Sequence, residues 1–269
     1  MTRPAGPRGR LRKRWRYVAA FSDELMVCAA RVAVGPLGQT FWAVLDRSTG
    51  QLVERTRIRL PGTLGEVAAE EPGGACGPSE VRINSSLLRG ALRLADGTPW
   101  EATCRTAEGG EVWTRKRTGV AVHGELEAAD GRRWSLDGLG VIDETDGYHP
   151  RHTVWSWSAG VGQTSDGRAA GWNLVEGVND PEHGSERAVW LDGVPSEIPP
   201  VEFNGLSGAA FADGSRLDFA AEAERRRSEN KLLVRYSYRQ PFGTFTGTLP
   251  GGVELASGIG VMEHHDAWW

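Results

Sequence analysis

Turn signals of the Asp-Gly and Gly-Gly type punctuate this chain and separate segments in which apolar and polar residues alternate. They occur at Asp96-Gly97, Gly109-Gly110, Asp130-Gly131, Asp166-Gly167, Asp192-Gly193, Asp213-Gly214 and Gly251-Gly252. Such dipeptides provide the backbone conformations that tight hairpins require, and alternation is the pattern of a half-buried strand. The sequence therefore predicts an all-β chain of antiparallel strands, closed into barrels or folded as a sandwich to protect its edges.

Two segments bear on how these strands are organised. Residues 217–231 include an Ala, Glu and Arg run that favours a helix by propensity, but a strand ending in a charged hairpin tip fits equally well. Phe41-Trp42-Ala43-Val44-Leu45-Asp46 is echoed by Ala188-Val189-Trp190-Leu191-Asp192-Gly193. The echo suggests an internal duplication, and the 269 residues are enough for two domains.

Composition excludes several classes of function. The net charge of −4 gives no overall basic field for nucleic acid, and no apolar run is long enough to span a membrane. Residues 1–13 are basic and are expected to form a disordered arm without the apolar core of a signal peptide. Cys28, Cys76 and Cys104 lack zinc-site spacing and are interpreted as isolated thiols in a reducing, cytoplasmic setting. Nucleotide-binding, hydrolase-elbow and zincin motifs are absent, so we expect neither a cofactor nor a metal.

The densest polar patch lies between residues 143 and 152 and leads into an aromatic strand. It contains Asp143, Tyr148, His149 and His152, and it is followed by Trp155-Ser156-Trp157. Period-two geometry places Trp155 and Trp157 on one face. An acid-base group beside aromatic faces suits a ligand pocket, with Asp143 or His149 as proton donor or acceptor. The alternative is a solvated loop whose carboxylates cap turns.

Polar residues within other expected strands are further candidates for the pocket. Trp172 and Asn173 lie in one strand and Glu186 precedes the next, while Gln240 and Glu263 lie near the C-terminus. A polar side chain on an inner face must contact a ligand or join an internal hydrogen-bond network. Glu186 facing inward would also need a basic partner such as Arg151 or Arg239. We therefore predict Asp143, His149 and Glu263 as catalytic candidates, and Tyr148, His152, Trp155, Trp157, Trp172, Asn173, Glu186 and Gln240 as ligand contacts.

Several motifs resemble the Domain of Unknown Function 2804 family from about Arg14 to the C-terminus. They are Lys13-Arg14-Trp15-Arg16-Tyr17, Trp113-Thr114-Arg115-Lys116, Gly147-Tyr148-His149, Trp155-Ser156-Trp157-Ser158-Ala159-Gly160, Trp172-Asn173-Leu174, Ser185-Glu186-Arg187, Gln240-Pro241-Phe242-Gly243 and Gly260-Val261-Met262-Glu263. That family is similar to the hydroxyneurosporene synthase and AttH-like group. The resemblance implies a bacterial protein with two lipocalin-like antiparallel β-barrels packed side by side and few short helices.

The implied domains are residues 14–139 and 140–269, each large enough for its own core. Relatives of this broad type include carotenoid hydratases and pericyclases that act on polyenes. We therefore expect a small lipophilic molecule, such as an isoprenoid, acyl chain or polyketide, in an aromatic-lined barrel cavity. Three alternatives stay open, namely binding alone, a cofactor-independent hydratase, isomerase or cyclase, and a scaffold. The oligomeric state is not defined by the sequence.

Overall fold

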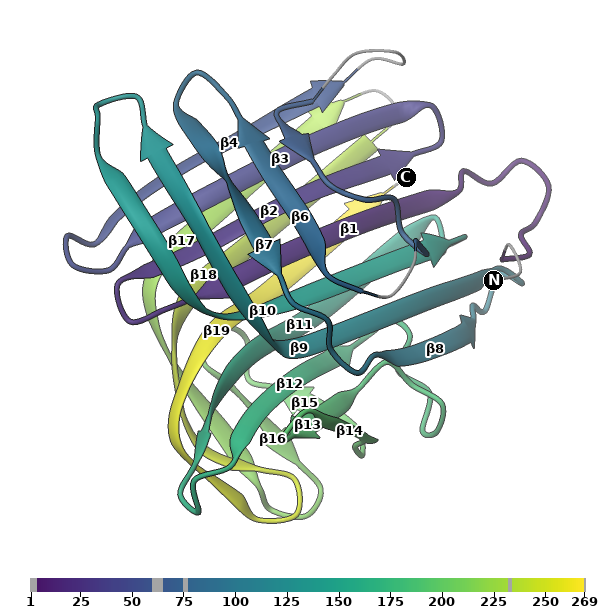
Figure 1. Cartoon of the computed structure of the whole chain (residues 1–269). Coiled ribbons are helices and arrows are strands. Elements are labelled where there is room, and N and C mark those ends of the chain that lie inside the picture. The colour runs from purple at the N-terminus through teal and green to yellow at the C-terminus, as the bar shows by residue number, and fades with distance from the viewer. Residues whose placement is uncertain (1–3, 60–64, 75–76, 232–233, 269) are drawn as a thin grey trace.

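A computed structural model describes residues 4–59, 65–74, 77–231 and 234–268, and these residues form two antiparallel sheets and no helix. Consequently none of the described residues lies in a helix able to span a membrane. The expected all-β tandem architecture is confirmed, because each sheet curls into a half-barrel (Figure 1). Alternating apolar residues and left-handed turn glycines account for this, with Gly131 at φ 89° and Gly193 at φ 77°.

The first sheet contains the first ten strands. They are β1 (Lys13–Phe21), β2 (Leu25–Val34), β3 (Leu37–Asp46), β4 (Gln51–Arg59), β5 (Val67–Ala68), β6 (Ser79–Asn84), β7 (Leu88–Leu94), β8 (Trp100–Arg105), β9 (Glu111–Ala128) and β10 (Arg133–Gly147). Their order is β4-β3-β2-β1-β10-β9-β7-β6-β5, and β8 pairs separately with β9.

The second sheet contains the remaining nine strands. They are β11 (His152–Thr164), β12 (Ala169–Glu176), β13 (Ala188–Leu191), β14 (Val194–Glu197), β15 (Val201–Phe203), β16 (Gly208–Phe211), β17 (Arg216–Lys231), β18 (Val234–Leu249) and β19 (Val253–Trp268). Their order is β14-β13-β12-β11-β19-β18-β17-β16-β15, which repeats that of the first sheet. In each half the first strand pairs with the last long strand, and the sequence echo falls on the equivalent strands β3 and β13.

The chain passes from one sheet to the other between Gly147 and His152. The expected boundary at 139/140 falls inside β10, where Leu139 and Gly140 pair with β1 of the first sheet. The basic segment is ordered from residue 4 onward, since Arg12 pairs with Asp146 and the backbone N–H of Ala5 donates to Glu111. Sequence alone missed these contacts because they join residues more than one hundred positions apart.

The described residues form three apolar cores, and one of these lies between the two sheets. The first half-barrel is filled by residues such as Trp42, Leu92 and Val122, and the second by Trp172, Phe219 and Phe245. The third core joins the outer faces of both sheets and includes Tyr17 and Trp157 among its members. Because side chains fill both half-barrels, the layer between the sheets is the place to search for a site.

Residues 216–231 form the long strand β17, which decides between the two alternatives that the sequence left open. A bulge between Ala221 and Ala223 shifts the strand's alternation by one residue. Leu217 and Phe219 therefore face the second half-barrel, whereas Ala223 packs into the layer between the sheets. The same shift brings Arg225, which is fully buried, into that layer.

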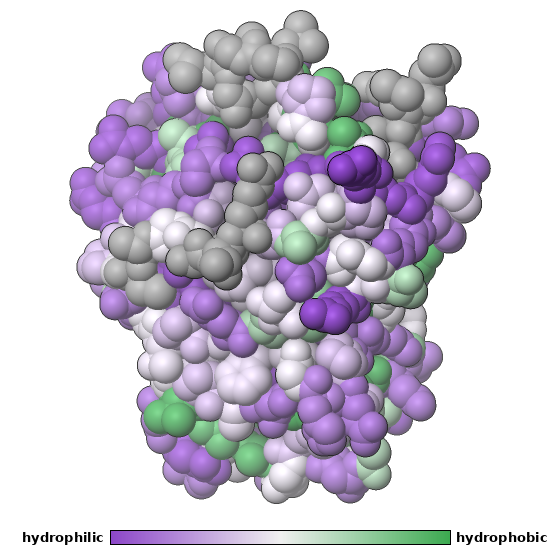
Figure 2. Space-filling view, turned by 90° about the vertical axis from the view of Figure 1, so that its right-hand side faces the viewer, coloured by the Kyte–Doolittle hydropathy of each residue, from purple (hydrophilic) through white to green (hydrophobic). Residues whose placement is uncertain are grey.

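The outer surface carries scattered apolar side chains among polar ones. Figure 2 shows mostly hydrophilic residues on the face turned to the viewer, with small separate apolar patches. The large exposed apolar residues are Leu11, Leu37, Ile58, Leu87, Val154, Val194 and Trp268. Scattered single residues of this kind are normal on a protein surface and do not mark a site.

Candidate functional site

A cavity of about 110 Å³ lies between the two sheets and is walled by aromatic and charged side chains from both. Its apolar wall consists of Trp15, Tyr17, Val32, Phe41, Trp155, Trp157, Val175, Val178 and Tyr238. Its ionisable wall consists of Lys116, Asp143, His149, Glu186, Glu263 and His265, and Asn179 completes it. Strands β1, β2, β3, β9 and β10 supply one side, and β11, β12, β18 and β19 supply the other, while His149, Val178, Asn179 and Glu186 come from connecting segments.

An ion-paired cluster of three side chains forms one end of the cavity. Lys116 on β9 lies directly opposite Asp143 on β10, and its Nζ is 2.5 Å from Asp143 Oδ1. The same Nζ lies 3.4 Å from Glu186 Oε2, which also accepts a 3.1 Å hydrogen bond from Asn179 Nδ2. All three ionisable residues are buried. Within this cluster, one cation is shared between two carboxyl groups.

The pKa shifts in this cluster follow from burial and from that charge imbalance. Burial raises the pKa of Glu186; Lys116 opposes the shift and the Asp143 charge adds to it. Burial alone would lower the pKa of Lys116, but the two carboxylates outweigh this effect and raise it. Lys116 therefore stays charged, while the shift at Glu186 favours the protonated form of its carboxyl group.

Glu186 is positioned by bonds that tie the two sheets together. Trp100 Nε1 donates to the carbonyl of Ser185 at 2.9 Å, and Trp190 Nε1 donates to the carbonyl of Thr98 at 2.8 Å. Asn173 Nδ2 donates to the backbone carbonyl of Glu186 at 2.8 Å. These bonds fix the segment before β13 against the first sheet, so the Glu186 carboxyl can reach Lys116 across the layer.

His149 is a buried histidine whose two ring nitrogens have no hydrogen-bond partner among the described residues. Its ring lies 5.0 Å from the Trp15 ring, centroid to centroid. Burial lowers the pKa of His149 to about 3, and the charges of Lys13 and Lys116 add to this shift. The ring is therefore neutral near pH 7 and offers one donor and one acceptor to whatever occupies the cavity.

The aromatic wall is held rigid by hydrogen bonds from its indole nitrogens. Trp157 Nε1 donates to Asn173 Oδ1 at 2.8 Å, and Trp155 Nε1 donates to Glu263 Oε1 at 3.1 Å. Glu263 Oε2 accepts a further bond from Gln240 Nε2 at 2.9 Å. Both Glu263 oxygens thus hold neighbouring side chains in place, which makes this residue a support for the wall.

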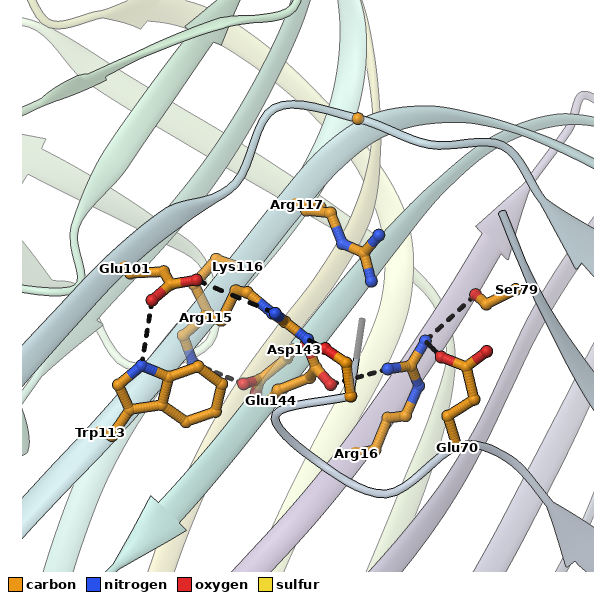
Figure 3. Close-up of polar contacts among 12 residues, drawn as sticks. Arg16, Glu70, Ser79, Glu101, Trp113, Arg115, Lys116, Arg117, Asp143 and Glu144 are labelled. Atoms are coloured by element: carbon orange, nitrogen blue, oxygen red, sulfur yellow. Dashed lines mark hydrogen bonds and ion pairs between the residues drawn. The ribbon is translucent and has the colours of Figure 1, made fainter. Parts of the chain in front are cut away.

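The opposite face of the same two strands carries a second buried ionic cluster, inside the first half-barrel (Figure 3). Glu144 Oε1 accepts from Arg16 at 2.7 Å and Glu144 Oε2 accepts from Arg115 at 2.6 Å. Arg115 also donates to the carbonyl of Gly74 at 2.8 Å. The alternation of β9 and β10 sends Arg115 and Glu144 inward and Lys116 and Asp143 into the cavity.

The structure gathers six of the eleven sequence-predicted site residues around the cavity. They are Asp143, His149, Trp155, Trp157, Glu186 and Glu263. Asn173 and Gln240 lie just behind this wall, where they bond Trp157 and Glu263. The sequence had suggested Arg151 or Arg239 as the base for Glu186, whereas the structure places Lys116 there.

Three predicted ligand contacts lie away from the cavity. Trp172 packs in the core of the second half-barrel over Gly160, where an added Cβ would come within 2.3 Å of its ring. Tyr148 covers Gly6 and Gly110. His152 is exposed, bonded to Asp266 at 2.8 Å and stacked on Trp268 at 4.1 Å. Trp172 and Trp157 lie on opposite faces of the sheet, because Trp157 pairs with Val175 whereas Trp172 pairs with Gly160. The sequence does not reveal this register.

Sequence reasoning found Asp143 on β10 but missed the cavity residues that the first sheet supplies from β1, β2, β3 and β9. Tyr17 and Phe41 lie on β1 and β3, in segments that read as ordinary core strands, and their rings are 6.3 Å apart. Lys116 carries only a weak local signal, because a cation close to Trp113 in the sequence fits a solvated strand end equally well. No local pattern indicated that the outer faces of two sheets would meet, and this meeting creates the cavity.

The arrangement supports hydrogen bonding and proton transfer to an apolar molecule. The described residues contain no cluster of three or more His, Cys, Asp or Glu side chains suited to hold a metal. His264 and His265 face opposite sides of β19, with His264 bonding Ser156 and His265 lining the cavity. Cys28 and Cys104 are free thiols, while Cys76 lies outside the described residues.

Solved structures of low sequence identity share this fold over nearly the whole chain. An AttH protein of Nitrosomonas europaea has a TM-score of 0.58 at 16% identity, covering 94% of this chain and 92% of that one. Kievitone hydratase from Nectria haematococca has a TM-score of 0.55 at 10% identity, with 94% and 88% covered. CghA has a TM-score of 0.53 at 11% identity, with 96% and 88% covered, and its structure with Sch210972 has a TM-score of 0.51 at 10% identity with the same coverage.

The match at the level of amino-acid sequence covers a smaller part of the chain than the structural matches do. No curated protein shows a significant match to the chain. The family model described as domain of unknown function (DUF2804) matches residues 98–269, which is more than half of the 269 residues. The chain therefore belongs to the DUF2804 family.

Proposed function

We propose that this protein binds one small lipophilic molecule, or one end of it, in the cavity between its two sheets. The observation that carries the proposal is the aromatic-walled space in which both nitrogens of His149 lack a hydrogen-bond partner among the described residues. Apolar walls with a few converging polar groups are typical of small-molecule sites. A hydroxyl or carbonyl group on the ligand would satisfy His149, whose unpaired burial otherwise costs about 1–3 kcal/mol.

The size of the cavity restricts the ligand. About 110 Å³ is less than the roughly 300 Å³ at the lower end of drug-sized pockets, so a single ring or a short branched chain fits. An isoprenoid, acyl or polyketide molecule would place only its terminal part there. Two proteins that share the fold support a small-molecule role, since one is a hydratase by name and the other has been solved with Sch210972. The free thiols Cys28 and Cys104 are consistent with a cytoplasmic location, which is part of the proposal.

Native mass spectrometry of the protein purified from its own host, followed by denaturing extraction, tests binding directly. We expect one discrete lipophile near one-to-one occupancy. A matched preparation of the His149→Phe variant should carry less of it, because phenylalanine fills the space but offers no hydrogen bond. Equal occupancy in both proteins would contradict the placement of the ligand, and an empty wild-type protein that also binds no added lipophile would contradict the function.

A second candidate function is cofactor-independent hydration, isomerisation or cyclisation of such a molecule. It is favoured by the raised pKa of Glu186, because a carboxyl group whose pKa is raised suits general acid catalysis. In a hydration, Glu186 would protonate one alkene carbon, water would add to the other, and Asp143 would take the water proton. Return of that proton to Glu186 would restore the site. The ring faces of Trp155 and Trp157 would stabilise the carbocation that forms when the alkene is protonated.

A Glu186→Gln variant separates the two functions. Glutamine keeps the shape and the bond from Asn179 but carries no transferable acid proton. We expect the extracted molecule to bind the variant within about threefold of wild type, while any conversion falls by about 10²-fold or more. Conversion that survives unchanged would exclude Glu186 as the acid, and absence of conversion by wild-type protein leaves binding as the function.

A further inference from the structure

A second cavity of about 150 Å³ adjoins the first and lies nearer to the edge of the layer between the sheets. The two cavities share the side chains of Phe41, Tyr238 and His265. The second one, here called the vestibule, includes the exposed residues Glu54 and Arg226, whereas no side chain lining the inner cavity is exposed. The two cavities are therefore adjacent, and an elongated molecule that extended past the three shared side chains would occupy both of them.

The two cavities carry opposite charge. The inner cavity is lined by one lysine, Lys116, and by three acidic residues, Asp143, Glu186 and Glu263. The vestibule is lined by four arginines, Arg55, Arg225, Arg226 and Arg227, and by one acidic residue, Glu54. An anionic group is thus repelled from the inner end and attracted to the outer end, over a path partly screened from water.

Ion pairs reduce this positive charge without removing it. Arg225 pairs with Glu54 at 2.8 Å, Arg55 pairs with Glu66 at 3.2 Å, and Arg227 pairs with Glu229. Even with these three acids counted, one guanidinium is in excess. Arg226 is exposed at the vestibule and has no ion pair within the part of the chain that the structure describes.

Arg225 gives the passage a fixed wall. Its guanidinium carbon lies 4.4 Å from the centroid of the Phe41 ring and 5.4 Å from that of Tyr238. It donates to the Tyr238 hydroxyl at 2.8 Å and to Gln240 Oε1 at 3.2 Å. A buried arginine held by two rings and several acceptors keeps the junction between the cavities in one shape.

From this charge gradient we infer that the ligand is an elongated amphiphile with a carboxylate or similar anionic group at one end. Its apolar end lies in the inner cavity beside Trp155 and Trp157, and its anionic end lies in the vestibule near Arg226 and Arg227. The inference rests on the proposed binding function, and it adds the polarity and direction of the bound molecule. Charge-assisted hydrogen bonds to guanidinium groups supply the selectivity.

Three probes with the same phenylbutyl skeleton test the inference, namely 4-phenylbutanoate, 4-phenylbutan-1-ol and 4-phenylbutylamine. Their dissociation constants can be measured with the full chain by isothermal titration calorimetry and by quenching of tryptophan fluorescence. We expect the carboxylate to bind about tenfold more tightly than the alcohol and the amine to bind most weakly. The preference for the carboxylate should decrease as salt is raised, because the vestibule is partly exposed.

A double variant, Arg226→Gln with Arg227→Gln, localises the effect. The carboxylate should bind it about tenfold more weakly than wild type and about as well as the alcohol, whose own affinity stays within twofold. Arg216→Gln is the matched control, since Arg216 lies exposed on the same strand β17 outside both cavities. Circular dichroism and thermal unfolding check that each variant is folded.

The outcomes distinguish the inference from the function beneath it. Equal binding of carboxylate and alcohol, or tightest binding of the amine, overturns the anionic polarity while leaving lipophile binding intact. A carboxylate preference that survives in the double variant overturns the assignment to the vestibule. Failure of all three probes, together with an empty protein from the native host, overturns the binding function and the inference with it.

Discussion

The two faces of β9 and β10 offer a comparison between a buried carboxylate held by two arginines and a buried lysine shared by two carboxyl groups beside a cavity. On the inward face, both oxygens of Glu144 are bonded to arginines, Arg16 and Arg115. On the outward face, Lys116 is shared by Asp143 and Glu186, and the nearby ring of His149 has no hydrogen-bond partner in the part of the chain that the structure describes. Both clusters come from consecutive residues, so sequence neighbourhood alone does not distinguish them (Figure 3).

The difference separates a structural ionic cluster from a functional one. Buried charges are tolerated when each is paired and hydrogen-bonded, as at Glu144. The outward cluster combines a shared cation, a carboxyl group with a raised pKa and a neutral histidine around a cavity. We therefore expect substitutions on the inward face to change stability, and those on the outward face to change binding and pH dependence.

The largest expected effect on stability is that of Glu144→Gln. This change leaves Arg16 and Arg115 buried without their carboxylate, which should lower the free energy of unfolding by about 3–5 kcal/mol. Urea unfolding measures the loss, with exposed Glu125→Gln on β9 as a control expected to change less than about 0.5 kcal/mol. A loss below 1 kcal/mol would mean that the inward cluster is not a structural element.

Lys116→Met should lower stability by about 2–3 kcal/mol near pH 8, less than Glu144→Gln because Glu186 can take up a proton. The pKa of Glu186 in the folded protein lies above its unfolded value. Stability from such a group is fully present below pH about 4.3 and is lost as pH rises through the folded pKa. The deficit of the variant should therefore grow between pH 5 and 8 in denaturant titrations, whereas a pH-independent deficit would contradict the coupling.

His149→Phe should alter the pH dependence of folding more than stability at pH 7. The wild-type pKa of about 3 lies below the unfolded value of about 6.5, so stability present above pH 6.5 is lost as pH falls toward 3. The variant lacks this loss and should gain about 2 kcal/mol over wild type at pH 5. At pH 7 it should be at least as stable as wild type, because an unpaired polar group has been removed.

Parallel urea titrations at pH 7 and pH 5 provide that measurement. The same protein should show weaker ligand binding, so stability and binding move in opposite directions. If His149 had an unseen structural partner, the variant would instead lose stability at pH 7.

The smallest effect is expected at His152, which the sequence placed among the ligand contacts. His152→Ala removes an exposed pair with Asp266 and should change stability by less than about 1 kcal/mol. Binding of 4-phenylbutan-1-ol should match that of wild type, as judged by fluorescence quenching. A tenfold weaker affinity would show that the site extends beyond the two cavities.

Much of the fold could be predicted because it is encoded locally. Alternation and turn glycines indicate strands wherever they occur, and the echo between β3 and β13 marks equivalent positions in two sheets of the same order. Residues 217–231 could not be assigned, because a charged run with both helix and strand propensity is decided by its pairing with β18. The bulge at Ala221 is likewise a tertiary feature, since it depends on the register of two strands.

Only part of the candidate site could be predicted from the sequence. Asp143, His149 and Trp157 stood out because they concentrate acid-base and aromatic chemistry in one short segment, and they do line the cavity. Tyr17 and Phe41 gave no signal, since an aromatic residue in a strand has the same pattern in a core and in a pocket wall.

By itself, the sequence determined an antiparallel all-β chain and a segment rich in acid-base groups, because periodicity and residue type act over a few positions. Only the tertiary structure decided that the half-barrels are filled and that the cavity lies between them. It also paired Lys116 with Glu186, seventy residues away along the chain. The physical reason is that such contacts depend on strand register and on the packing of one sheet against another, which no local pattern specifies.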